Sequence, residues 1–371
     1  MKILFVLENY LPHIGGVEIV FKNLCEGLAA KGHRVTVVTH RMPGTKARER
    51  MAGVEVIRIR CMDSRYLFTF AAVPEVIRCA KNSDIIHTTT YNGAFPAWIG
   101  AIVRRKPKII TVHETWLGRW REFSNFSAPV TWAHELLEWL VYHIPRFDRY
   151  VCVSESTKNM LSEALPSRSE RIVRIHNGFD APPKASQQEV QKLRESLGVK
   201  GKFAIFAYGR PGTSKGFEYL VQAYPLIKKR IPDAKLLLML SKDTQYRHKV
   251  EEFKRSSPDI VFLDPQPYAK LAAYRALADC IVVPSITEGF GYAAIEAASS
   301  GTPVVTTDTT SIPEVIYGKH ILVKPKSAKA IADGVVKVKR GEYKTAPAKR
   351  FPWSETVWEY EKLYEKLEGR K

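Results

Sequence analysis

The chain has 371 residues, 45% of them hydrophobic and 26% charged, which excludes a disordered or low-complexity protein and predicts two globular domains. The net charge of +19 predicts a negatively charged binding partner, such as nucleic acid, anionic lipid or a phosphorylated substrate. The charge alone does not distinguish among these partners.

The N-terminus, MKILFVLENY, has too short an apolar run for a signal peptide. No stretch reaches the ~18 uninterrupted apolar residues of a membrane span. The five cysteines are scattered and contain no C-x-x-C pair, which is typical of buried thiols in a reducing compartment. We therefore expect a cytoplasmic protein, and the sequence leaves open peripheral contact with the inner face of the cell membrane.

The first half of the chain alternates strands and helices. An apolar strand at Ile3–Leu7, a loop at Gly15-Gly16, a helix to about Ala30 and a strand at Arg34–Thr39 predict a βαβ unit with a parallel sheet. The following strands are expected at Val54–Arg60, Ile85–His87, Lys108–Val112, Tyr150–Val153 and Ile172–His176.

The second half repeats this alternation after a polar linker at Pro182–Gln188. It predicts a second doubly wound sheet, and an amphipathic helix ends the chain. Its strands are expected at Phe203–Tyr208, Leu236–Leu240, Ile260–Leu263, Cys280–Val283 and Val304–Thr306.

The most informative stretch is Pro284–Gly301, PSITEGFGYAAIEAASSG. A flexible turn, Glu288–Gly291, leads from a strand into an alanine-rich helix that begins at Tyr292. The first N–H groups of a helix lack intrahelical partners, and the helix dipole adds positive potential there. The stretch therefore predicts a phosphate site.

Two carboxylates flank this phosphate site. Glu288 lies before the helix and Glu296 about one turn inside it. Carboxylates accept hydrogen bonds from vicinal hydroxyls, so the spacing suits a sugar–diphosphate–ribose ligand. Taken alone, two such acids more often belong to an ordinary strand–helix unit.

A second loop, Gly209–Gly216, carries two cations. Arg210 offers a bidentate fork and Lys215 a point charge to a diphosphate. The loop is not a P-loop, because it lacks G-x-x-x-x-G-K-[ST]. Basic pairs in loops are common, so this pair alone is weak support.

Together these motifs resemble the retaining glycosyltransferases of family GT4. EGFGYAAIEAASSGTPVV resembles the family's E-x7-E motif, and GRPGTSKG its GR…KG motif. IPEV, GGVE, TVHETW and NGFD resemble further family elements. The resemblance implies the GT-B fold, an α/β architecture of two Rossmann-like doubly wound domains facing across a cleft. It implies an acceptor domain at 1–180, joined by a C-terminal helix at 354–371 that crosses back to it, and a donor domain at 190–353.

The resemblance also implies the site residues. Catalytic roles fall to Glu288, His113, Arg210 and Lys215, with His113 reaching the donor sugar; a lone histidine at a strand end is otherwise more often structural. The donor-binding residues are Gly15, Gly16, Gly209, Arg210, Lys215, Glu288, Gly289, Phe290, Gly291, Tyr292, Ala293 and Glu296. The chain has no D-x-D and no His/Cys cluster with metal spacing, so we expect no required metal or cofactor.

The implied reaction is retaining transfer of a hexose or N-acetylhexosamine from a UDP- or GDP-linked sugar. The basic charge and the aromatic stretch Trp116–Phe126 favour a membrane lipid or lipid-linked glycan as acceptor, with contact to an anionic membrane. EAASSGTPVV with IPEV is similar to the enzymes that add N-acetylglucosamine to phosphatidylinositol. The helix at Ala133–Ile144 is expected to pack on the sheet; the alternative is a surface that enters lipid headgroups.

Two other functions are compatible with parts of the sequence. A GT-B sugar-nucleotide epimerase would use the same donor motifs. A non-catalytic nucleic-acid-binding protein would use the positive charge, but Lys and Arg are spread over both halves without an RNP or helix-turn-helix motif. We therefore expect no nucleic-acid partner.

Overall fold

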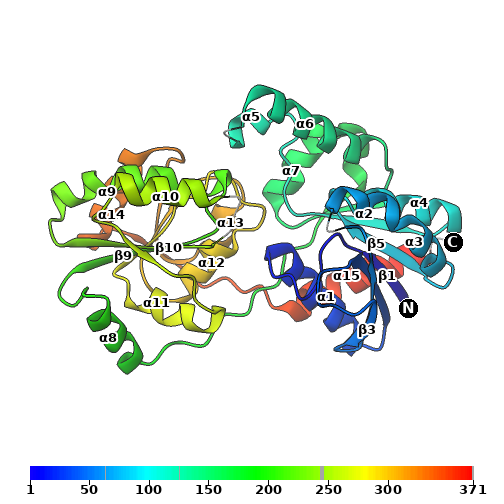
Figure 1. Ribbon diagram of the computed structural model, residues 1–371, viewed down its shortest axis with the longest axis horizontal. Coiled ribbons are helices and arrows are strands. Elements are labelled where there is room, and N and C mark those ends of the chain that lie inside the picture. The colour runs from blue at the N-terminus through cyan, green and yellow to red at the C-terminus, as the bar shows by residue number, and fades with distance from the viewer. Residues whose placement is uncertain (63, 125, 243–245, 370–371) are drawn as a thin grey trace. The chain divides into compact units, whose positions relative to one another are not determined.

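The computed structural model describes residues 1–62, 64–124, 126–242 and 246–369. The chain forms two compact units. Unit 1 comprises Met1–Glu122, Phe126–Asp180 and the end of the chain from Phe351, and unit 2 consists mainly of Ala181–Arg350. Each unit is a sheet covered by helices (Figure 1).

Within the described residues, unit 1 holds an eight-stranded sheet in the order β3-β4-β2-β1-β5-β6-β7-β8. Its strands are parallel except β3, which runs antiparallel to β4. The strands are β1 (Lys2–Val6), β2 (Arg34–His40), β3 (Arg48–Met51), β4 (Val54–Ile59), β5 (Ile85–Thr89), β6 (Lys108–Val112), β7 (Arg149–Cys152) and β8 (Ile172–Arg174).

Helices cover both faces of the unit 1 sheet. Ile3 and Phe5 of β1 join one core cluster with α1 and α15, whereas Leu4 and Val6 join another with α3 and α4. This follows from the alternation of side chains along a strand. The helices are α1 (Gly16–Ala30), α2 (Arg65–Ala71), α3 (Val73–Ala80), α4 (Ala94–Arg104), α5 (Trp120–Phe123), α6 (Ala128–His143), α7 (Glu155–Ala164), a 3₁₀ helix (Pro166–Arg171) and α15 (Trp353–Glu368).

The last helix, α15, packs on α1 of unit 1, so the predicted crossing back of the C-terminal helix is confirmed. A Cβ on Gly27 of α1 would lie 2.6 Å from Val357, so the two helices approach closely. Tyr360 and Tyr364 of α15 are buried in this contact with unit 1. Of the predicted range 354–371, residues 370 and 371 lie outside the described residues.

Unit 2 holds a seven-stranded sheet within its described residues, in the order β11-β10-β9-β12-β13-β14-β15. All pairs are parallel except β14 with β15. The strands are β9 (Phe203–Gly209), β10 (Ala234–Leu240), β11 (Val261–Leu263), β12 (Cys280–Val283), β13 (Val304–Thr307), β14 (Gly318–Val323) and β15 (Lys344–Ala346).

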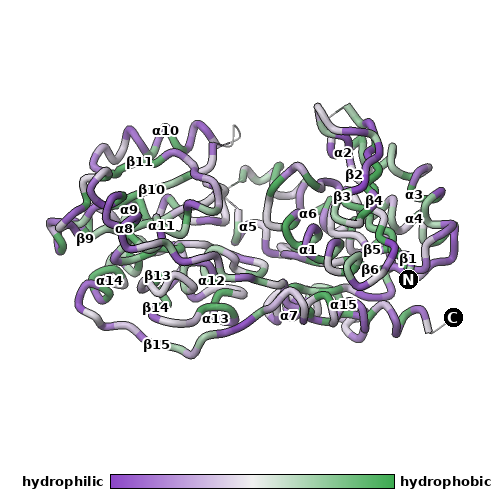
Figure 2. The backbone as a smooth tube through the Cα atoms, turned by 90° about the horizontal axis from the view of Figure 1, so that it is seen from below, coloured by the Kyte–Doolittle hydropathy of each residue, from purple (hydrophilic) through white to green (hydrophobic). Residues whose placement is uncertain are grey.

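Two layers of helices enclose this second sheet as well. Ile205 of β9 lies in a core cluster with α9 and α14, while the neighbouring Phe206 stacks on Tyr274 of α11. The outer helix α10 is largely hydrophilic, whereas β10 is largely hydrophobic (Figure 2). The helices are α8 (Gln187–Ser196), a 3₁₀ helix (Thr213–Lys215), α9 (Phe217–Arg230), α10 (Arg247–Ser256), a 3₁₀ helix (Tyr268–Lys270), α11 (Leu271–Leu277), α12 (Tyr292–Ser299), α13 (Ile312–Val315) and α14 (Ala328–Lys339).

The predicted fold class, two doubly wound α/β sheets, is confirmed. Three strands were not predicted: β3, β14 and β15. β3 (RERM) and β15 (KTA) are short edge strands without an apolar pattern, and β14 (GKHILV) has a short apolar run and is only partly buried.

Removal of one buried hydroxyl tests the attachment of α15. The Tyr364 hydroxyl lies 2.6 Å from His87 Nδ1, and both side chains are buried. Tyr364→Phe leaves that ring nitrogen unpaired, so we expect it to lower the free energy of unfolding by about 1–3 kcal/mol in urea denaturation. Tyr66→Phe, at a hydroxyl-bearing ring that is 60% exposed, is the control. If both variants have the same free energy of unfolding, the Tyr364–His87 hydrogen bond does not stabilise the attachment of α15.

Candidate donor and acceptor sites

The predicted donor residues gather at one edge of the unit 2 sheet. Strands β9 and β12 are neighbours, with β10 and β11 on one side and β13 and β14 on the other. The order of the strands therefore reverses between β9 and β12. In open α/β sheets, ligands bind beyond the carboxyl ends of the strands at such a point.

The chain leaving β9 carries the two predicted cations. Gly209 ends β9 with a φ of 144°, and Arg210 is exposed. The Arg210 guanidinium has no hydrogen-bond partner among the residues that the structure describes, so it is available to a ligand. Lys215 Nζ lies 2.7 Å from Glu288 Oε1, and thus the second cation faces the loop after β12.

A backbone contact holds these two loops together. Gly216 has a φ of 64°, and a Cβ there would lie 2.1 Å from the carbonyl oxygen of Pro284. The Ile286 N–H donates to the Ser214 carbonyl over 2.7 Å. A side chain at position 216 would collide with the backbone, so glycine is required for this approach.

Glu288 is held firmly, and its side chain is 9% exposed. Besides bonding Lys215, its Oε1 accepts from the Ser285 hydroxyl at 2.7 Å. The Glu288 N–H donates to the Thr310 hydroxyl at 2.8 Å, and the Ser311 hydroxyl donates to the Glu288 carbonyl at 2.9 Å. The carboxylate is therefore preorganised to accept further hydrogen bonds.

Helix α12 begins at the same edge. Its N-cap, Gly291, has a φ of 92° and makes no side-chain cap hydrogen bond, and the helix dipole adds positive potential at this end. Phe290 is buried and packs edge-on against Tyr292 with 5.1 Å between ring centroids. The buried Phe290 ring thereby anchors the Gly289–Gly291 turn at the start of α12.

Glu296 lies in a cluster that the sequence did not predict. Its Oε2 accepts from the Tyr208 hydroxyl at 2.9 Å and from Arg275 Nη1 at 3.3 Å. Burial raises the pKa of Glu296, whereas the charge of Arg275 opposes that rise. Arg275 is 1% exposed, so it is a buried counter-ion within the apolar helix LAAYRAL. The sequence signal that could have revealed this ion pair was Arg275 itself, a charged residue within an apolar helix.

The remaining predicted residues lie in unit 1, near the carboxyl ends of its strands. Gly15 caps α1, which begins at Gly16, and Phe21 of that helix packs edge-on against the His113 ring at 5.7 Å. Burial lowers the pKa of His113 to about 4, so the ring is neutral near pH 7. His113 Nε2 is buried and has no hydrogen-bond partner among the described residues. A ligand hydroxyl would satisfy it.

The segment after His113 is held by a buried acid, Glu138 of α6. Its carboxylate accepts from the Thr115 hydroxyl and the Trp116 N–H, both at 3.0 Å, and from Trp120 Nε1 at 2.6 Å. Sequence analysis missed this residue, because a glutamate on an amphipathic helix usually faces solvent. Burial raises the pKa of Glu138 to about 7 despite these donors.

Two further properties of the described residues bear on the function. They contain no group of three or more His, Cys, Asp or Glu side chains placed to hold a metal ion. None of the described helices is long and apolar enough to cross a membrane.

Comparison with solved structures shows the fold. The chain superimposes on the Anabaena protein HepE in complex with UDP and glucose with a TM-score of 0.73 and 19% identity, over 99% of this chain and 100% of that one. Sucrose-phosphate synthase from Thermosynechococcus elongatus gives a TM-score of 0.73 and 22% identity, over 100% and 99%. The fold is that of the GT-B glycosyltransferases.

The family follows from sequence matches. Residues 14–181 match Glycosyltransferase Family 4, and residues 189–350 match Glycosyl transferases group 1. The chain is 31% identical to the uncharacterized glycosyltransferase MJ1607 of Methanocaldococcus jannaschii, over 91% of this chain and 89% of that protein. It is 23% identical to the alpha-monoglucosyldiacylglycerol synthase of Streptococcus pneumoniae, over 87% and 76%. The chain belongs to the glycosyltransferases of family 4, with a group 1 glycosyl transferase domain in its second half.

The titration of Glu138 gives a pH prediction. As the pH falls through about 7, the carboxylate gains a proton and can no longer accept from all three donors, including Trp120. We expect tryptophan fluorescence to show a transition with a midpoint near pH 7. Glu138→Gln cannot titrate and should lack that transition. The same transition in both proteins would assign it to another group.

Proposed function

We propose that the protein transfers a hexose or N-acetylhexosamine, with retention, from a UDP-linked sugar to a membrane lipid or lipid-linked glycan. The observation that carries the proposal is the position of Arg210, Lys215 and the start of α12 on the loops that leave the neighbouring strands β9 and β12. These groups suit a diphosphate, and the structural neighbour HepE was solved with UDP.

In this assignment each acid contacts one end of the donor. Glu288, fixed by Lys215 and Ser285, accepts from hydroxyls of the transferred sugar. Glu296, set by Arg275, accepts from the ribose. Gly15, Gly16 and His113 of unit 1 are assigned to the donor by the family resemblance alone.

The reaction breaks the bond between the anomeric carbon and the diphosphate oxygen. Negative charge then grows on the leaving diphosphate, where Arg210, Lys215 and the α12 amides stabilise it. Glu288 Oε1 already accepts two hydrogen bonds, which suits a hydroxyl-binding role better than that of a nucleophile. We therefore assign retention to attack from the face that the diphosphate leaves, with the departing phosphate taking the acceptor proton.

The outward side of α6 supports a lipid acceptor. We expected the apolar stripe of this helix to pack on the sheet, and for most of the stripe this prediction is wrong. The buried residues of α6 are Thr131, Glu138, Val141 and Tyr142. Large apolar side chains are instead exposed at Val130, Trp132, Leu136, Leu137, Trp139 and Ile144. Arg121 and Arg146 are exposed beyond its two ends. Apolar residues flanked by cations suit the headgroup region of an anionic membrane.

Donor binding can be tested without knowing the acceptor. Arg210 makes no described contact that folding needs, so Arg210→Ala should keep the melting temperature. We expect it to weaken UDP binding about 10–100-fold in calorimetric titration, the effect of losing one charge-assisted hydrogen bond. Arg255→Ala, at an exposed arginine of α10, is the matched control. If Arg210→Ala binds UDP like the wild type, the nucleotide lies elsewhere.

The activity itself is tested by incubating the protein with UDP- and GDP-linked sugars and a lipid extract, with mass spectrometry of the products. Transfer adds one hexosyl or N-acetylhexosaminyl mass to a lipid. An isomerised nucleotide sugar formed without acceptor would instead indicate an epimerase.

Membrane contact through α6 is tested with vesicles of phosphatidylcholine and phosphatidylglycerol. Trp132 and Trp139 are 66% and 44% exposed. The double variant W132S/W139S should lose at least tenfold in vesicle affinity, equivalent to about 1.4 kcal/mol of burial. Trp358→Ser changes a tryptophan of α15 that is 51% exposed and should leave affinity unchanged. Unchanged binding by the double variant would exclude α6 as the contact.

A further inference from the structure

Unit 1 has its own point of strand-order reversal, between β1 and β5. From β1 the order runs through β2 and β4 on one side and through β5 and β6 on the other. The chain leaving β1 carries Glu8, and the chain leaving β5 carries Tyr91 and Asn92. Ligands of open α/β sheets bind beyond the carboxyl ends of such strands.

Three polar side chains meet at this point. Glu8 Oε1 accepts from Arg65 Nε at 2.8 Å, and Glu8 Oε2 accepts from Asn92 Nδ2 at 2.6 Å. Arg65 is on α2, so three separate segments contribute to the cluster. Both oxygens of the carboxylate are thus engaged, and they orient the guanidinium and the amide.

The guanidinium is only partly used. The Arg65 side chain is 62% exposed, whereas that of Glu8 is 10% exposed. The two terminal nitrogens of Arg65 make no hydrogen bond to any residue within the described part of the chain. An exposed ion pair contributes little to the free energy of folding. The Arg65–Glu8 pair is therefore poorly explained by a role in stability alone. A planar fork with free donors matches a phosphate or carboxylate.

The loop after β5 supplies an independent observation. Tyr91 has a φ of 74°, a left-handed conformation that costs a non-glycine residue roughly 1–2 kcal/mol. The next glycine, Gly93, is pressed against β1: a Cβ there would lie 2.7 Å from the Val6 carbonyl oxygen. Tyr91 is 45% exposed as a whole residue, and it interacts electrostatically with both Arg65 and Glu8. Strain of this kind concentrates at ligand sites.

We propose that Arg65, oriented by Glu8 and Asn92, binds a phosphoryl group of the acceptor, with Tyr91 beside it. This inference rests on the proposed function and specifies the acceptor as anionic. The phosphoryl group belongs either to a phospholipid headgroup or to a soluble phosphate ester. Both present the oxygens that a guanidinium fork recognises.

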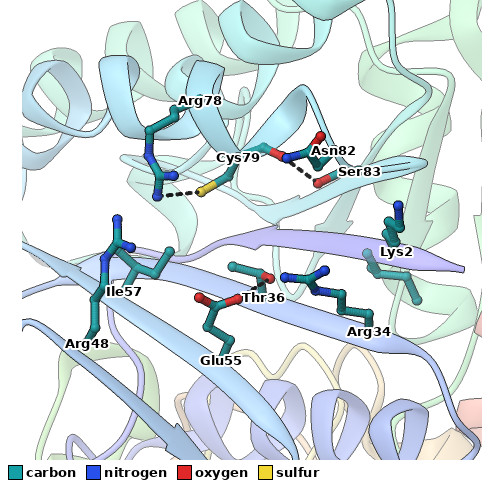
Figure 3. A pocket seen from close by; sticks show the side chains of 11 residues that line it. Lys2, Arg34, Thr36, Arg48, Glu55, Ile57, Arg78, Cys79, Asn82 and Ser83 are labelled. Atoms are coloured by element: carbon teal, nitrogen blue, oxygen red, sulfur yellow. Dashed lines mark hydrogen bonds between the residues drawn. The ribbon is translucent and has the colours of Figure 1, made fainter.

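The basic pocket of unit 1 in Figure 3 is a rival location and supplies a control. It lies where β1 and β2 begin, at Lys2 and Arg34. Arg48, which also lines it, bonds Glu75 at 2.9 Å, and Glu75 is shared with Arg78. The Arg48 side chain is 57% exposed, close to the exposure of Arg65, so it is a matched arginine on the edge strand β3.

The test compares wild type, Arg65→Gln, Arg65→Lys and Arg48→Gln with two probes. One probe is glycerol 3-phosphate; the other is phosphatidylcholine vesicles with and without phosphatidylinositol. We expect one probe to bind the wild type, with at least tenfold weaker binding to Arg65→Gln, intermediate binding to Arg65→Lys and no change for Arg48→Gln. For the vesicles, only the phosphatidylinositol-dependent part should fall, because contact through α6 persists.

UDP titration of the same proteins separates this proposal from the proposed function. Arg65→Gln should bind UDP like the wild type. Binding of neither probe by the wild type, or equal binding to wild type and Arg65→Gln, would overturn the phosphoryl assignment even if UDP binds. If the wild type does not bind UDP, the donor assignment is overturned instead. Preference for one probe identifies the source of the phosphoryl group.

Discussion

The donor site depends on the close approach of two backbone segments, at Gly216 and Pro284. Because no side chain separates them, the loop after β9 and the loop after β12 share hydrogen bonds and place Lys215 against Glu288. The start of α12 follows directly from the second loop. Any separation of the two segments would move the cation, the acid and the amides relative to one another, so one glycine contact governs the geometry of the whole group.

The sequence predicted the strand, the turn and the helix of this region well because their features are local. An apolar run, a glycine turn and an alanine-rich helix each have a distinct pattern, and they follow one another between Cys280 and Ser299. Arg275 was missed because its partner Glu296 is 21 residues away, and an arginine without a known partner is usually placed at the surface. The packing of α6 was wrong because helical periodicity locates an apolar stripe without revealing which side meets the rest of the protein.

The two units handle charge differently. Unit 2 presents Arg210 and Lys215 around a helix start, an arrangement suited to a diphosphate. Unit 1 buries His87 and His113, whose pKa values fall to about 3 and about 4, so both rings are neutral. A neutral histidine can exchange hydrogen bonds with a sugar without adding charge. Positive charge at the carboxyl ends of the unit 1 strands comes from arginines instead, and Arg65 is the one that Glu8 orients.

The return of α15 to unit 1 affects how the protein is made. During synthesis the first 180 residues leave the ribosome long before the helix that covers Phe5 and Phe21, whereas nearly all of unit 2 is contiguous. Unit 2 can therefore fold while unit 1 still exposes an apolar face. The nascent N-terminal half is the part most in need of a chaperone, and a fragment that ends at the linker would inherit the same exposed surface permanently.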